Sequence, residues 1–468
     1  MNKPNTVTIQ VSLSVRLWLY LLTIFLLGTL IVTISVKEAM ASANVTQKDM
    51  QSELPEDNIR IGDFITYAFE HNPSIQEARA TWKMAVEKFR IQTGYPDPKL
   101  MVTYFPDPIE TRLGPQEWNA SITQTIPFPG KLSKAGKVAE HDANIARIKL
   151  DLAIRNIVVA IRESVFELYY IRQAKKIADQ NQKLLDHLRK VTETQYAQDG
   201  AALVDVVKAQ AQVGQLRYDI LLLDDLEVTE ITKLNSILNR SPEAPVGIIQ
   251  FESLPQAVMS LSDIYTLAEQ HQEEIKIAIE NIKKAQAKVN LARAKNLPDF
   301  SLGLFYASIG EPDVPEPPDE SGRDVLGVQA GITIPLWYGK NKSKVNLAHA
   351  ERRKARAAKQ QRINTTRTAV RTLFFKLQNS ERIITLYQQD LIPQAKAAVQ
   401  LSETFFKAGE SSYTDFIETQ SVLYNFQLAL ARARADYGLY VVRLEQLVGR
   451  EIALGGTAPL SNQAGDES

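Results

Sequence analysis

The chain has 468 residues, with 54 Lys and Arg against 54 Asp and Glu, 44% hydrophobic residues and no cysteine. The hydrophobic share suits a folded protein, and zero net charge argues against a nucleic-acid binder, because phosphate contacts need a surplus of cations. The missing cysteines exclude disulfides, thiolate nucleophiles, thiolate zinc sites and lipid attachment to an N-terminal cysteine. With only 21 glycines, long helices are favoured over folds that are rich in tight turns.

The N-terminus carries an uncharged apolar run of 20 residues, from Leu17 to Val36, after Lys3 and Arg16. The small residues Ala41 and Ala43 follow at the spacing of a signal-peptidase site. We therefore predict a signal peptide over residues 1–43. The run is longer than an ordinary signal core, so an uncleaved membrane anchor is the alternative. In both cases the remainder of the chain is exported.

The rest of the chain contains an internal repeat. TQYAQDGAALVDVVKAQ at 194–210 aligns with TFFKAGESSYTDFIETQ at 404–420, and two earlier matches keep the same order. Three ordered matches indicate a duplication. The predicted repeats span residues 44–250 and 251–450, followed by a tail over 451–468, and each repeat is expected to contain a helix, a β-hairpin and two long helices.

The predicted long helices dominate each repeat. In the first repeat they cover residues 131–239, broken only by a turn at Asp199-Gly200. In the second they cover 341–448, with a turn at Gly409 and a kink at Pro393. Heptad spacing of apolar residues on the return helix predicts a packed seam. The residues that carry this spacing are Val206, Val213, Leu216, Ile220 and Leu223.

Four segments alternate apolar and polar residues with period two, which predicts half-buried strands. They form two hairpins, over 99–126 and 300–334, joined by turn-rich loops at 106–117 and 311–324. Some of these runs are long enough to cross a bilayer as tilted strands. Four strands cannot close a barrel in lipid, so several chains are needed. Two chains would give eight strands and a filled interior, whereas three would give twelve and leave a lumen.

The duplicated segments, the strand-to-helix joints QTIPFPGK and ITIPLWYGK, and TDFIETQSVLYN at 414–425 resemble the TolC-like outer membrane efflux protein family. The resemblance implies a mainly α-helical chain with a small β part. Three chains would form a 12-stranded barrel in the outer membrane of a Gram-negative bacterium, continued by a helical tunnel in the periplasm. QTIPFPGK is similar to the heavy-metal efflux branch.

The resemblance also implies acidic rings at the periplasmic end of the pore, and the matching positions are Asp415 and Glu418. They lie three residues apart and so share one helical face. The alternative is that two acids near a helix start only cap and solvate the helix. Where some members carry a latch arginine this chain has Ser411, so closure is expected to use different bonds and we assign no latch partners.

No other pattern predicts chemistry. The five histidines are scattered, and the sequence predicts no metal site, cofactor or catalytic residue. Adjacent acids, Asp224 with Asp225 and Glu273 with Glu274, are interpreted as solvated surface. The basic run at 351–356 is interpreted as a solvated helix face.

The sequence thus predicts the outer-membrane exit duct of a tripartite efflux system and not an enzyme. The resemblance implies a homotrimer in outer membrane lipid, a periplasmic adaptor (membrane fusion protein) and an inner-membrane transporter of the resistance-nodulation-division type. The alternatives are the duct of a type I protein secretion system and an inner-membrane-anchored structural coiled-coil protein. Alternation at 118–126 and 325–334 favours a duct over the coiled coil.

Overall fold

A computed structural model describes residues 59–250, 259–408, 410–450 and 452. The chain divides into two units, Met1–Glu53 and Leu54–Ser468, and all described residues belong to the second. The predicted signal peptide, with Ala41 and Ala43, lies outside the described residues, as does the predicted tail apart from Ile452.

The described part begins with six elements. They are α2 (Ile61–His71), α3 (Pro73–Thr93), β1 (Lys99–Thr111), β2 (Gly114–Ile126), α4 (Lys131–Ala197) and α5 (Leu203–Leu238). The break between the first two helices has a local cause. The Asn72 side chain accepts hydrogen bonds from the N–H groups of Ser74 and Ile75, and Pro73 occupies the first position of α3. Both features start a new helix.

The same order of elements then occurs again. The elements are α6 (Leu261–His271), α7 (Glu273–Ala294), β3 (Asp299–Ile309), β4 (Val325–Thr333), α8 (Tyr338–Leu386), the π-helix η1 (Tyr387–Leu391), α9 (Ile392–Lys407) and α10 (Tyr413–Val448). Helix α4 begins at the predicted residue 131, α5 ends one residue before the predicted 239, and α10 ends at the predicted residue 448. Within the described ranges, no helix combines the length and apolar character that a bilayer crossing demands.

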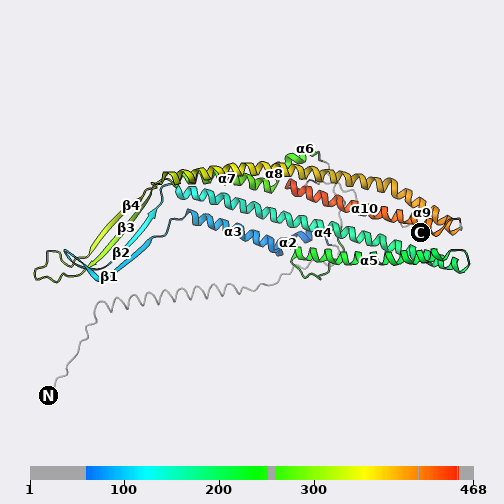
Figure 1. The fold of residues 1–468 in the computed structure, drawn as a ribbon, viewed down its shortest axis with the longest axis horizontal. Coiled ribbons are helices and arrows are strands. Elements are labelled where there is room, and N and C mark those ends of the chain that lie inside the picture. Colours follow the sequence, from blue (N-terminus) through cyan, green and yellow to red (C-terminus); the bar gives the residue numbers. More distant parts are fainter. Residues whose placement is uncertain (1–58, 251–258, 409, 451, 453–468) are drawn as a thin grey trace, which may run out of the picture. The chain divides into compact units, whose positions relative to one another are not determined.

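The four strands form one antiparallel sheet in the order β1-β2-β3-β4. The helices that enter and leave the sheet lie beside one another in the matching order α3, α4, α7 and α8 (Figure 1). One layer of helices therefore continues one layer of strands. The connection is held by Asp299, whose carboxylate accepts hydrogen bonds from Lys131 Nζ and Phe128 N, each at 2.8 Å. This contact joins the predicted QTIPFPGK motif to the start of β3.

The prediction of the first loop is wrong. The stretch 106–117 was expected to be a turn-rich loop, but most of it extends β1 and β2, leaving only residues 112 and 113 between them. Pro106 and Pro108 are tolerated because they fall where the pairing of β1 with β2 shifts register, between Tyr104 and Ile109. The second predicted loop, 311–324, lies outside the strands as expected.

As predicted, the helical conformation continues past Pro393. The five-residue π-helix η1 precedes it, and the N–H of Ile392 donates to the carbonyl of Tyr387. Proline lacks an N–H and its ring crowds the preceding turn, and a wider turn accommodates both. Helical conformation therefore continues from α8 into α9.

The heptad seam of α5 is confirmed. Val206, Val213 and Leu216 are buried, and Ile220 and Leu223 pack against them. A second prediction fails, because Glu273 is buried and not a solvated surface residue. Arg155 Nε lies 2.7 Å from its carboxylate, whereas the neighbouring Glu274 pairs with Arg362 on a much more exposed face. Adjacent acids point to different sides of a helix, and one of these sides faces α4.

Candidate functional site

The candidate pore residues lie where the two long helical hairpins turn. The α4–α5 turn contains Asp199, which has a left-handed backbone with φ 57°, and Gly200, whose N–H donates to the carbonyl of Gln195 at 2.8 Å. The α9–α10 turn is closed by the N–H of Glu410, which donates to the carbonyl of Phe405 at 2.9 Å. The predicted turn residue Gly409 lies outside the described residues. Both turns lie at the end of the helices remote from the sheet (Figure 1).

Asp415 forms a capping box at the start of α10. The Ser412 hydroxyl accepts from the N–H of Asp415 at 3.2 Å, and the Asp415 carboxylate accepts from the hydroxyl and the N–H of Ser412. The side-chain and backbone hydrogen bonds from Ser412 lower the pKa of the Asp415 carboxyl. Glu418, one turn further on, is exposed. The structure thus gives Asp415 the capping role of the alternative interpretation and leaves both acids facing solvent in the single chain.

The opposite face of the same turn is buried. Tyr413, Phe416 and Ile417 are between 0% and 5% exposed and pack into an apolar cluster that joins both hairpins. The other members of this cluster are Ala178, Leu185, Leu188, Ala209, Val213, Leu216, Ala395, Val399, Phe406 and Leu423. The cluster holds the first turn of α10 against α4, α5 and α9, and thereby fixes the direction in which Asp415 and Glu418 project.

Near the turns, three polar contacts among the described residues cross between the hairpins. Gln420 Nε2 donates to Asn181 Oδ1 at 2.9 Å, and Tyr413 Oη donates to Gln212 Oε1 at 3.3 Å. Lys208 Nζ donates to Thr414 Oγ1 at 3.1 Å. Burial, together with the nearby carboxylate of Asp205, raises the pKa of the Tyr413 phenol to about 12. This phenol is therefore neutral and remains a donor throughout the physiological range.

Sequence reasoning missed these contacts. Gln420 follows the buried Phe416 by four residues and Ile417 by three, so a polar side chain on an apolar face was the available indication. The partner Asn181 could not be inferred, because it lies 239 residues away in the chain. Among the described residues there is no group of three or more His, Cys, Asp or Glu side chains that could hold a metal ion.

Comparison with known proteins agrees with this architecture. The outer membrane efflux protein family model matches residues 264–450. The chain is 25% identical over 320 residues to the pyoverdine export outer membrane protein OpmQ of Pseudomonas aeruginosa, and the match covers 65% of this chain. These matches make the chain similar to the outer membrane efflux protein family, and they agree with the predicted location in the outer membrane.

Other relatives extend the comparison. The chain is 21% identical to the outer membrane protein TolC of Vibrio cholerae, over 66% of this chain and 72% of that protein. The match to OpmQ spans 63% of OpmQ's own length. Among solved structures, CusC superposes with a TM-score of 0.72 at 15% identity, over 87% of this chain and 96% of CusC. VceC of Vibrio cholerae gives 0.70 at 18% identity, over 84% and 96%. At these identities, the structural likeness shows the fold and selects no branch of the family.

Proposed function

We propose that the protein is the outer-membrane exit duct of a tripartite efflux system. The observation that carries the proposal is the four-stranded sheet, whose first and last strands, β1 and β4, each pair with a neighbour on one side only among the described residues. Exposed apolar side chains line both strands, including Leu100 at 71% and Leu326 at 76%. Unpaired edges are not tolerated in lipid, so these edges must be covered by other copies.

Three copies complete the duct. They supply twelve strands for a barrel with a lumen, and the layer of α3, α4, α7 and α8 from each copy continues the barrel wall into the periplasm. A periplasmic adaptor and an inner-membrane transporter of the resistance-nodulation-division type supply coupling and energy. The duct itself is passive, so the transporter selects the cargo. OpmQ is named for pyoverdine export, and this chain conducts its own cargo through the same kind of assembly.

The constriction is formed by Asp415 and Glu418. Their exposed positions on one face of α10, opposite the buried cluster, support this assignment. In a trimer each residue contributes a ring of three carboxylates, which attracts cations. The capping bonds of Asp415 are compatible with this role, because each carboxylate oxygen can accept more than one hydrogen bond.

The experiment is conductance in planar bilayers. The wild type should form cation-selective channels blocked by multivalent cations from the periplasmic side. The double variant Asp415→Asn with Glu418→Gln should lose most of that block. The matched control is Asp199→Asn with Asp205→Asn, which removes the same charge at the other hairpin turn and should leave the block unchanged. Cross-linking that yields only monomers and dimers would contradict the trimer, and equal block in both variants would contradict the constriction.

The orientation is tested separately. The loop 311–324 lies at the far end of the sheet from the helices, so it should face the exterior. An epitope tag inserted beside Glu320, an exposed residue with φ 71°, should be labelled on intact cells. Labelling only after permeabilisation of the outer membrane would reverse this orientation.

A further inference from the structure

A basic groove lies between α4, α7 and α8 in the part of the helical layer nearest the sheet. Its volume is about 560 Å³, within the range of small-molecule sites. The described residues that line it include five Lys or Arg and one His, and no Asp or Glu. These basic residues are Lys134, Lys137, His141, Lys283, Arg352 and Arg356. The sequence interpretation treated part of this set, at 351–356, as an ordinary solvated face.

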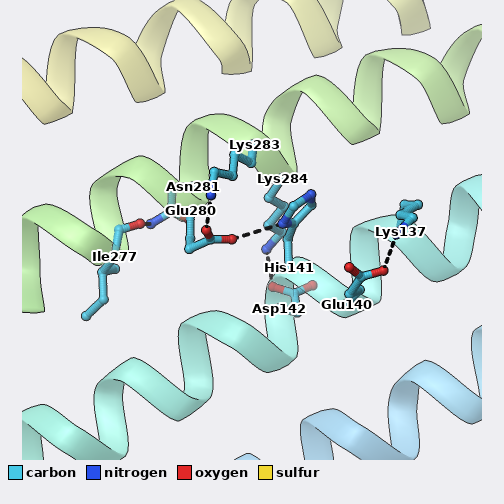
Figure 2. Close-up of polar contacts among 9 residues, drawn as sticks. All are labelled: Lys137, Glu140, His141, Asp142, Ile277, Glu280, Asn281, Lys283 and Lys284. Carbon is cyan, nitrogen blue, oxygen red and sulfur yellow. Dashed lines mark hydrogen bonds and ion pairs between the residues drawn. The ribbon is translucent and has the colours of Figure 1, made fainter.

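Two nearby acids neutralise only part of this charge. Glu280 accepts from Lys283 Nζ at 2.6 Å and lies 3.0 Å from His141 Nδ1, and Lys137 pairs with Glu140 at 2.7 Å (Figure 2). Burial raises the pKa of Glu280, but the hydrogen bonds from Lys283 and His141 outweigh it and lower the pKa overall. Glu280 is therefore ionised at neutral pH and already shared between two partners.

The other three cations have no ionic partner. Within the described residues, no ion pair involves Lys134, Arg352 or Arg356. Arg352 donates from Nη1 to the side-chain oxygen of Gln286, but its Nε is buried without a hydrogen-bond partner. A buried guanidinium N–H that lacks an acceptor is unfavourable. An anion in the groove would supply the counter-charge that these three side chains lack.

The opposite side of α7 and α8 provides a contrast. A second groove of similar size there is also lined by cations, but three of them are paired with carboxylates. The pairs are Lys284 with Asp142, Lys288 with Glu351 at 2.8 Å and Arg362 with Glu274 at 2.7 Å. Helix α8 carries 13 Lys and Arg but only two Asp and Glu, and Glu351, the acid within the basic run, is paired on that side.

We propose that the basic groove binds a phosphate group, either in the headgroup of an anionic lipid or as free phosphate. The planar Arg fork matches phosphate oxygens, and the lysines add charge without demanding fixed geometry. The unpaired cations share one groove, and no carboxylate in its lining compensates their mutual repulsion. A bound phosphate would reduce that repulsion.

The position of the groove brings it close to lipid. Lys134 and Lys137 lie within the first seven residues of α4, about 10 Å along the helix from its start. Exposed Trp337 and Tyr338 at the end of the sheet are residues typical of a membrane interface. Arg356 lies 14 residues before Val370, which is close to a whole number of helical turns, so both residues lie on the same face of α8. Val370 packs against α6 on that face. The closeness to lipid rests on the proposed function, whereas binding of phosphate does not.

The test compares two variants of the full-length protein with equal loss of charge. The groove variant is Lys134→Gln, Arg352→Gln and Arg356→Gln. The control is Arg353→Gln, Lys354→Gln and Lys359→Gln, all on α8 and outside the groove. One arm titrates detergent-solubilised protein with inorganic phosphate by calorimetry. The other incubates it with equimolar phosphatidylglycerol and phosphatidylethanolamine and counts retained lipids by native mass spectrometry.

Wild type and control should bind, and the groove variant should bind at least about tenfold more weakly, because several charge-assisted hydrogen bonds are removed. Loss of phosphatidylglycerol adducts alone identifies the lipid source, and loss of phosphate heat alone identifies the free ion. Equal binding by all three proteins in both arms would overturn the proposal. If the groove variant does not assemble, Arg356→Gln alone should still weaken binding, and unchanged binding would overturn the proposal. Neither arm depends on conductance, so this proposal and the proposed function can fail separately.

Discussion

Gln420 of α10 donates a hydrogen bond to Asn181 of α4 across 2.9 Å, inside the apolar cluster that joins the two hairpins. Both side chains are less than a tenth exposed, and Gln420 Oε1 has no hydrogen-bond partner. The pair is thus a polar contact in an apolar setting. Such a contact fixes the register of packed helices more than it adds to stability.

Removal of one partner of this pair should be costly. Gln420→Ala leaves the Asn181 amide buried and unsatisfied, so the free energy of unfolding should fall by about 1–3 kcal/mol. Gln420→Leu combined with Asn181→Leu should restore most of the loss, since both polar groups are then gone. Gln215→Ala, which removes an exposed hydrogen bond to Asp219, is the control and should change little. Thermal unfolding followed by circular dichroism measures all three; additivity of the two Leu substitutions would contradict the coupling.

Two neighbouring acids allow a direct comparison of buried and exposed ion pairs. Glu273, with a 5% exposed side chain, pairs with Arg155, which also donates to the carbonyl of Gly449 at 2.6 Å. Glu273→Ala should lower the free energy of unfolding by about 3–5 kcal/mol, because Arg155, whose side chain is only 27% exposed, then loses its counter-charge. Glu274→Ala breaks a pair whose side chains are 36% and 43% exposed and should cost at most about 1 kcal/mol. Equal losses measured by chemical denaturation would contradict this difference.

Periodicity made the elements predictable, and the same reasoning explains where prediction failed. The long helices and the four strands follow from residue spacing, which is local information. Burial of Glu273 was missed because it depends on which helix lies opposite, and α4 is far away in the sequence. The extension of β1 through its prolines was missed because the sequence does not show that the strand pairing shifts register at these residues. The basic groove escaped notice because its residues come from three separate helices.

The Ser412 cap should stabilise the turn that carries Asp415. Ser412→Ala should lower the free energy of unfolding by about 0.5–2 kcal/mol, since the N–H of Asp415 loses its acceptor. Ser411→Ala, which removes only a 3.3 Å hydrogen bond to the adjacent carbonyl, is the matched control and should be nearly neutral. A similar loss in both variants would show that the capping box adds nothing.

The same cap predicts a dependence on pH. Because the pKa of Asp415 is lowered in the folded state, its contribution is present above the unfolded value, near 4, and is lost as the pH falls through the folded value. The difference in thermal midpoint between wild type and Ser412→Ala should therefore shrink on acidification below pH 4. A difference that is unchanged between pH 7 and pH 3 would mean that the carboxylate takes no part.

Gly438 of α10 lies directly against the ring of Phe166 in α4. A Cβ atom at this position would lie 2.3–2.6 Å from ring atoms of Phe166, a side chain packed with Val159 and Val442. Gly438→Ala should therefore lower the free energy of unfolding by about 1–3 kcal/mol, because the two helices must separate or the ring must leave its rotamer. Gly214 in α5 has nothing within 4 Å of the corresponding position, so Gly214→Ala should stabilise by about 0.5–1 kcal/mol through helix propensity. Thermal unfolding should move the two midpoints in opposite directions. If both substitutions stabilise, the approach of α10 to Phe166 is loose enough to accept a methyl group.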